Sequence, residues 1–249
     1  MSLRIHVDAA LAAGLEFDLP PGPARHVQVR RAQPGDALVL FDGRGGEWAA
    51  EVRHMGRRQV TVQAMAHSAV YREPALGVTL AVGMPANDRM DWLVEKATEL
   101  GVAMVQPLMT DRSVLRLDGE RAQRKRDHWQ GIAVAASEQS GRTRVPVVAP
   151  VLALGPWLAG LGGDGGARTG DGNSARWLLS PGSGLLAPLA PVRPSAGAVL
   201  ALSGPEGGLS PAEEALAQSH GFQAISLGPR VLRADTAPLA LLAWLTLPQ

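Results

Sequence analysis

The chain has 249 residues, of which 46% are hydrophobic and 19% are charged, and its formal net charge is +1. This balance is typical of a folded globular protein, and it excludes a disordered chain and a protein that is basic throughout. The lack of cysteine excludes disulfides, thiolate zinc sites and cysteine nucleophiles. Arg4, His6 and Asp8 stand where a signal peptide would be apolar, and no apolar run approaches the roughly 20 residues that cross a membrane. We therefore expect a cytoplasmic protein.

Up to about residue 72 the hydrophobic pattern has a period of two. Short strands are expected at 37–41, 47–52 and 59–64, and a glycine-rich hairpin turn joins the first two. Strands at this spacing predict a small β-barrel. Basic residues cluster at 25–31 and 53–58, and from the sequence they are either solvated surface groups or RNA contacts.

From about residue 74 strands and helices alternate, which predicts an α/β domain with a largely parallel sheet. We therefore expect two domains, at 1–72 and 73–249. The glycine-rich stretch 160–173 is interpreted as a surface insertion. In chain order, the expected elements are a strand at 77–84, a helix at 88–101, a strand at 103–109, a helix at 120–140 and a strand at 176–180.

Two glycine-bearing loops follow strands in the last fifty residues. The strand expected at 198–202 leads into SGPEGG, and the strand expected at 224–228 leads into GPRVLRADTA. Ser210, Pro211 and Glu213 predict a capped helix after the first loop. Such loops either make tight turns or bring backbone amides against a ligand at the carboxyl edge of the sheet.

The final segment, APLALLAWLTL, is predicted to be a helix that is apolar on every side, with Asp235 or Thr236 as its cap and Pro238 in its first turn. Its own domain or a partner subunit has to cover it, so we expect a dimer. The six histidines show no metal-ligand spacing, and we expect no metal. Fingerprints of dinucleotide sites, phosphate loops and hydrolase elbows are missing from the sequence.

The pair LSGPEGGLSPAEEALA and LGPRVLRADTAPLALLA resembles the signature of the RsmE family, in the SPOUT superfamily of knotted methyltransferases. Further matches are DRMDWLVEKATELGV (88–102), the segment 111–146 and GDALVLFDGRGGEW (35–48). The resemblance implies an S-adenosylmethionine-dependent enzyme that methylates N3 of one uridine in 16S ribosomal RNA, free or in the 30S subunit. It also implies a PUA-like N-terminal barrel for RNA, a C-terminal α/β domain with a deep trefoil knot, and a homodimer.

For the uridine chemistry that the resemblance implies, we expect Arg233 to stabilise the uracil anion and Asp235 or Glu206 to accept its proton. Alternatively, Arg233 and Asp235 form an ion pair or a cap that orders the loop. The sequence has Asp235 where the family usually has Glu, Pro238 where Ala is common, and Arg30 where Leu is common. RNA contacts are expected at Arg4, Arg25, Arg31 and Arg112. The positions expected to hold S-adenosylmethionine are Leu202, Gly204, Glu206, Gly207, Leu227, Gly228, Arg230, Leu232, Arg233, Thr236 and Ala237.

Three other functions compete with this interpretation. A non-catalytic RNA-binding protein would share the barrel and the basic clusters but would not need both glycine loops. Another knotted RNA methyltransferase would act on a ribose 2′-hydroxyl or on guanosine. A nucleotide hydrolase is disfavoured, because no lysine lies in or beside either glycine loop.

Overall fold

The computed structural model describes residues 3–86, 88–161, 174–180, 194 and 197–247. The chain forms two compact units, one of residues 1–73 with 134–145 and the other of residues 74–133 with 146–249. The expected domains, 1–72 and 73–249, stay a prediction, and by its contacts the segment 134–145 belongs with the first unit. Most of the glycine-rich stretch, residues 162–173, lies outside the described residues.

The first unit contains a five-stranded sheet in which β1 and β3 are parallel and the other pairs are antiparallel. All three strands expected from the period-two pattern are present. The helix α1 was not expected; it begins at a proline, which suits the first turn of a helix because its missing N–H would have no intrahelical partner there. In spatial order the strands are β1 (Leu3–His6), β3 (Ala37–Phe41), β4 (Glu47–Met55), β5 (Val60–Ser68) and β2 (Glu16–Asp18), with α1 at Pro21–Val29.

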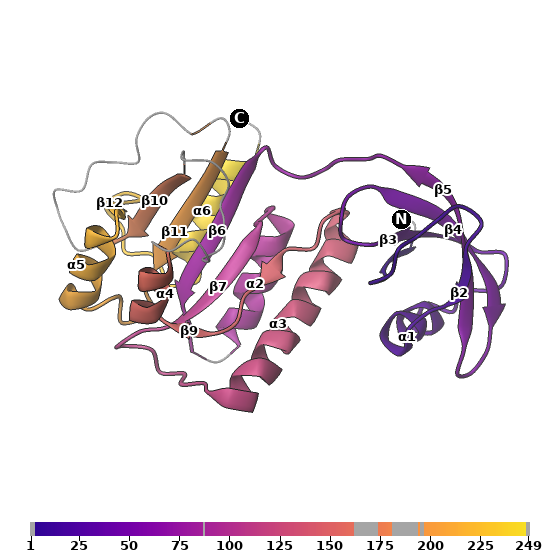
Figure 1. Cartoon of the computed structure of the whole chain (residues 1–249), viewed down its shortest axis with the longest axis horizontal. Coiled ribbons are helices and arrows are strands. Elements are labelled where there is room, and N and C mark those ends of the chain that lie inside the picture. The colour runs from indigo at the N-terminus through magenta and orange to yellow at the C-terminus, as the bar shows by residue number, and fades with distance from the viewer. Residues whose placement is uncertain (1–2, 87, 162–173, 181–193, 195–196, 248–249) are drawn as a thin grey trace. The chain divides into compact units, whose positions relative to one another are not determined.

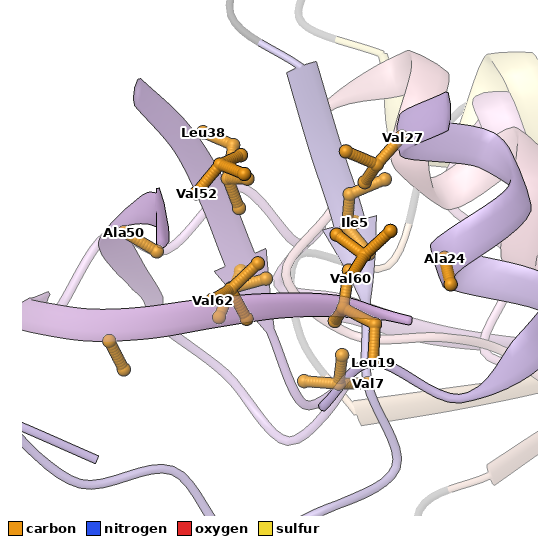
Figure 2. Packing of buried hydrophobic residues seen from close by; sticks show 12 residues of the cluster. Ile5, Val7, Leu19, Ala24, Val27, Leu38, Ala50, Val52, Val60 and Val62 are labelled. Carbon is orange, nitrogen blue, oxygen red and sulfur yellow. The ribbon is translucent and has the colours of Figure 1, made fainter. Parts of the chain in front are cut away.

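The core of the first unit is built by alternation along the strands. In β5, Val60, Val62 and Ala64 are fully buried, while the residues between them keep contact with solvent. Figure 2 shows Val60 and Val62 together with Val27 of α1 and Ile5 of β1 in one cluster, to which Ala64 also belongs. The hydrophobic pattern of the strands therefore determines which face α1 covers.

The second unit contains a seven-stranded sheet whose strand pairs are all parallel. This agrees with the α/β domain predicted from the sequence. In spatial order the strands are β12 (Gln223–Ile225), β10 (Ser174–Leu179), β11 (Gly197–Ser203), β6 (Leu76–Gly83), β7 (Met104–Met109) and β8 (Val147–Val148), and β9 (Leu152–Ala153) also pairs with β7. The helices that begin in this unit are α2 (Arg89–Glu99), α3 (Gly119–Ser140), α4 (Leu154–Gly160), α5 (Pro211–Ser219) and α6 (Thr236–Thr246).

Helices cover both faces of the parallel sheet. In Figure 1, α4 and α5 lie in front of the sheet and α6 lies behind it. Leu202 of β11 packs in the front cluster with Trp157 of α4 and Phe222. On α6, Leu241 and Leu242 are fully buried, so the domain itself covers much of the apolar helix. The apolar character of α6 therefore does not require a partner subunit.

Two further expectations concern a knot in the chain and membrane-spanning segments. A trefoil knot is a property of the whole path of the chain, and residues 181–193, 195 and 196, between β10 and β11, lie outside the described residues. Within the described part of the chain, no helix combines the length and the apolar character needed to span a membrane.

Candidate cofactor site

The carboxyl ends of the central strands form the floor of the candidate site. Leu179 of β10, Ser203 of β11 and Val82 of β6 lie in register, so the three strands end side by side. The first glycine loop, 204–209, leaves β11, and the second, 226–235, leaves β12. Because β12 pairs with β10, the two loops meet above the end of β10, at the edge of a parallel sheet where ligands bind.

A cavity of about 350 Å³ lies between the two loops, within the size range of small-molecule sites. Eight of the eleven residues expected to hold the cofactor line it. The cavity-lining residues are Arg89, Leu179, Ser180, Ser203, Gly204, Pro205, Glu206, Gly208, Ile225, Ser226, Leu227, Gly228, Arg230, Val231, Leu232, Arg233, Ala234 and Ala237.

The other three expected cofactor residues lie outside this lining. Leu202 is fully buried in the hydrophobic core. Gly207 faces the side chain of Arg112. Thr236, the first residue of α6, borders a separate hollow of about 370 Å³ between α2 and α6. Their inclusion followed from the sequence motif, which does not distinguish residues that face a cavity from residues that support it.

The glycines of the first loop are required by the loop itself. A Cβ atom on Gly204 would lie 2.6 Å from the carbonyl carbon of Gly208 and 2.6 Å from the backbone nitrogen of Leu209. Gly208 has a φ of +69°, in the left-handed region that favours glycine. At Gly204 a side chain would therefore collide with the backbone of its own loop.

The second loop also contains a tight turn. Gly228 has a φ of +110°. The Ser226 hydroxyl accepts from the N–H of Gly228 at 3.3 Å and donates to the carbonyl of Gly228 at 3.1 Å. At the end of this loop, the carbonyl of Arg233 accepts from the N–H groups of Thr236 and Ala237, both at 3.0 Å. The start of α6 therefore fixes the backbone from which the Arg233 side chain extends.

The charged groups of the cavity differ in how firmly they are held. Glu206 Oε1 accepts from the Ala86 N–H at 3.0 Å and from Arg89 at 3.2 Å. In contrast, the exposed side chains of Arg230 and Arg233 form no hydrogen bond or ion pair with the residues that the structure describes. The two free guanidinium groups are therefore available to a ligand, while Glu206 joins its loop to the start of α2.

Two of the three expected catalytic residues, Arg233 and Glu206, line the cavity, and Asp235 does not. Asp235 occupies the N-cap position of α6 with helical dihedral angles, and its side chain makes no cap hydrogen bond. Arg89 was missed by the sequence analysis. It lies in the family match 88–102, but nothing in its spacing relates it to a loop more than a hundred residues away.

The chemistry of the lining fits S-adenosylmethionine. Ser203 is 4% exposed, and its buried Oγ has no hydrogen-bond partner among the residues of the described structure. Such a group is costly unless a ligand or solvent satisfies it. Leu179 and Ile225 supply apolar surface for a ring, and the free arginines suit a carboxylate. The donor presents each of these features: an aromatic base, hydroxyl groups and an amino-acid end.

The four arginines expected to bind RNA have different surroundings. Arg25 lies on α1 and Arg31 follows it with a φ of 57°, and both are exposed. Arg4 is mostly buried: it donates to Glu47 and, at 2.9 Å, to a backbone carbonyl, and it lies over the ring of Phe41. Arg112 belongs to the second unit, where it donates to the first glycine loop.

Glu47 is the acidic centre of the Arg4 cluster. It accepts from Arg72 at 2.9 Å and from Arg4. These two guanidinium groups, Arg72 foremost, lower the pKa of Glu47 to about 2, against the opposing effect of its partial burial. The cluster therefore stabilises the first unit, and Arg4 takes part in it.

The fold and the cavity define an α/β protein with a ligand site at a glycine-loop edge, joined to a small mixed-sheet unit. Family models agree with this class: a model described as an RNA methyltransferase domain matches residues 72–246, and one described as an RNA methyltransferase PUA domain matches residues 24–65. The fold is that of SPOUT RNA methyltransferases with a PUA-like domain.

Similar proteins narrow the class to one family. The ribosomal RNA small subunit methyltransferase E of Bacillus subtilis is 33% identical over 219 residues, which cover 87% of this chain and 84% of that protein. The protein of the same name from Synechocystis is 37% identical over 216 residues, covering 87% and 67%. The chain belongs to the ribosomal RNA small subunit methyltransferase E family, as the motifs in its sequence predicted.

Two solved structures carry the cofactor. The Neisseria gonorrhoeae ribosomal RNA small subunit methyltransferase E, bound to S-adenosylmethionine, superposes with a TM-score of 0.86 at 32% identity, covering 98% of this chain and 96% of that one. A Legionella pneumophila methyltransferase in complex with the same cofactor gives a TM-score of 0.88 at 32% identity, covering 98% and 97%. S-adenosylmethionine is therefore the cofactor that this fold accommodates.

Proposed function

We propose that the protein transfers a methyl group from S-adenosylmethionine to N3 of a specific uridine in 16S ribosomal RNA. The cavity between the glycine loops is the observation that supports this proposal most directly. It combines the buried hydroxyl of Ser203 with the guanidinium groups of Arg230 and Arg233, none of which has a hydrogen-bond partner among the described residues. The relatives of the chain are named as small-subunit ribosomal RNA methyltransferases.

Bound S-adenosylmethionine would supply an electrophilic methyl group on a positively charged sulfur. The bond from sulfur to the methyl carbon breaks as the bond from N3 forms, and the N3 proton has to leave. Uridine N3 is protonated at neutral pH, so the chain has to favour the anionic base. Arg233 is suited to this role because its guanidinium stays charged and has no partner among the described residues.

The proton acceptor is the less defined part of the site. Glu206 already accepts two hydrogen bonds, from Ala86 and Arg89, which suits a group that orders the donor loop. Asp235 lies outside the lining of the cavity but only two residues after Arg233. We propose Arg233 as the electrostatic catalyst and retain Glu206 and Asp235 as alternative bases to be separated by substitution.

For RNA binding we propose the first unit, through the exposed residues Arg25 and Arg31. The match of residues 24–65 to an RNA methyltransferase PUA domain supports this assignment. Phosphate contacts of this kind release counterions, so affinity should fall steeply as salt rises. The substrate would be 16S RNA, either free or within the 30S subunit.

We also propose a cytoplasmic homodimer. The hollow between α2 and α6 supports the dimer, because Trp92 at its rim is 46% exposed and Leu239 and Ala240 lie beside it. Large exposed apolar groups of this kind often mark subunit contacts. Sedimentation of the purified protein tests the proposal, and a monomer at micromolar concentration would contradict it.

The central experiment uses labelled donor with either unmodified 30S subunits or free 16S RNA, followed by nucleoside analysis. Labelled N3-methyluridine from one of the two substrates is the expected product. Label on a ribose 2′-hydroxyl or on guanosine would assign the chain to another knotted methyltransferase activity. If calorimetry detects no donor binding, the chain is a non-catalytic RNA-binding protein instead.

A further inference from the structure

Arg112 lies in the turn that follows β7, about a hundred residues before the first glycine loop in sequence. We propose that it is a positioning residue for S-adenosylmethionine, holding loop 204–209 in its ligand-binding shape from the side opposite the cavity. This inference rests on the proposed function. It replaces the RNA contact that the sequence had suggested for Arg112.

The hydrogen bonds of Arg112 define the backbone of the loop at two points. Its Nη1 donates to the carbonyl of Gly207 at 2.7 Å and to the carbonyl of Leu209 at 3.2 Å. Between these carbonyls lies Gly208, with its left-handed φ of +69°. One guanidinium nitrogen therefore holds two carbonyl directions, one on each side of the residue with the left-handed φ.

The aliphatic part of Arg112 also lies against the loop. A Cβ atom built on Gly207 would lie 3.2 Å from Cβ and 3.3 Å from Cδ of Arg112. The residues on either side, Glu206 and Gly208, line the cavity, whereas Gly207 does not. The loop thus has an inner surface toward the cavity and an outer surface toward Arg112.

The residue before Arg112 strengthens the same attachment. The Asp111 N–H donates to Glu213 Oε1 at 2.8 Å, and the Ser210 hydroxyl donates to Asp111 Oδ2 at 2.8 Å. Ser210 and Glu213 form the capping box of α5, and Glu213 is only 8% exposed. The turn after β7 is therefore hydrogen-bonded both to the glycine loop and to the start of the helix that follows this loop.

A pre-shaped loop binds its ligand more tightly, because the cost of ordering it is met during folding. Arg112 remains partly accessible to solvent, which moderates the effect of removing it. We expect Arg112→Ala to weaken donor binding about tenfold, the scale of losing a hydrogen bond from a charged donor. Arg112→Lys keeps the charge but not the planar fork and should give an intermediate value.

The experiment compares the wild-type protein, Arg112→Ala, Arg112→Lys and a control, Arg121→Ala. The control removes an exposed arginine on α3 whose side chain forms no hydrogen bond or ion pair with the described residues of either loop. Calorimetry measures the donor Kd, and filter binding measures the affinity for 16S RNA across a salt series. Steady-state kinetics separate the KM for the donor from kcat.

The expected result is a raised donor Kd and donor KM for Arg112→Ala, with kcat at saturating donor, RNA affinity and its salt dependence close to the wild-type values. The inference would be overturned by an unchanged donor Kd, whether or not RNA affinity falls; a fall with a salt slope reduced by about one would restore the RNA contact. If Arg112→Ala does not fold, the lysine variant decides by the same criteria. If the wild-type protein itself binds no donor, the proposed function is refuted together with this inference. If the wild-type protein binds the donor and Arg112→Ala binds it equally well, only this inference is refuted.

Discussion

Gly204 and Gly207 lie three residues apart in the same loop, yet substitution by alanine should affect them very differently. The Cβ of Gly204→Ala would meet two backbone atoms, of Gly208 and Leu209, at 2.6 Å, well inside van der Waals contact. Because Leu209 is buried and Ser210 caps α5, the backbone at Gly208 and Leu209 cannot move away from the added Cβ atom. The loop has to open instead.

Overpacking of this kind costs about 1–3 kcal/mol. If the loop opens to relieve it, the cost reduces donor affinity by about 5- to 150-fold. The Cβ of Gly207→Ala meets only the side chain of Arg112, at 3.2 Å, and a shift of a few tenths of an ångström relieves the contact. We expect about 0.5 kcal/mol or less there, which is about a twofold change in Kd.

Calorimetric titration of both variants with S-adenosylmethionine tests the difference, and thermal unfolding of the free proteins reports any loss of fold. Equal donor affinities for the two variants would refute the reasoning, as would a larger loss for Gly207→Ala. A large fall in the unfolding temperature of Gly204→Ala, with donor binding intact, would show that the loop resists opening and that folding bears the cost.

Three further predictions concern other parts of the molecule. Arg233→Ala should bind the donor but slow single-turnover methylation by about 10²- to 10³-fold, and a normal rate would remove Arg233 from the mechanism. Ser203→Ala should weaken donor binding about three- to tenfold without lowering the unfolding temperature, since it removes a buried hydroxyl that has no partner in the described structure. Ser219→Ala, whose hydroxyl donates to a backbone carbonyl of α5 outside the cavity, is the control, and an equal effect there would contradict the assignment. The pKa of Glu47, lowered to about 2 chiefly by Arg72, implies stability that is complete above the ordinary value near 4.5 and is lost as pH falls toward 2. The full pKa shift corresponds to about 3 kcal/mol, which solvent screening reduces to about 1–2 kcal/mol. Glu47→Gln should therefore lower the unfolding free energy by about 1–2 kcal/mol at pH 7, and its stability should differ little from that of the wild type near pH 2. A difference in unfolding free energy that stays constant between pH 7 and pH 2 would contradict the prediction.

The regular elements were largely predictable because their signals are local. The alternation in β5 and the capping box at Ser210 both appear in the structure where the sequence places them. The helix α1 was missed, because a short segment with two prolines and two basic residues carries little periodicity. Its buried residues Ala24 and Val27 are recognised as core residues only once the sheet against which they pack is known.

Within the site, the sequence identified both glycine loops, and eight of the eleven residues that it assigned to the cofactor line the cavity. It could not separate the inner surface of the first loop from the outer one, so it did not reveal that Gly207 lies outside the cavity lining or that Arg112 donates to the loop. The link from Arg89 to Glu206 was likewise invisible, because the two residues are far apart in the chain.

What the sequence determined by itself is therefore the set of strands, caps and glycine turns, together with the family to which the chain belongs. These depend on neighbouring residues and on a motif that can be recognised as a string. Only the tertiary structure decided which side chains line the cavity and which contact the outer surface of the first glycine loop. That outcome depends on the order of strands in the sheet, where β12 pairs with β10 and brings two distant loops to one edge, and on hydrogen bonds between residues about a hundred positions apart.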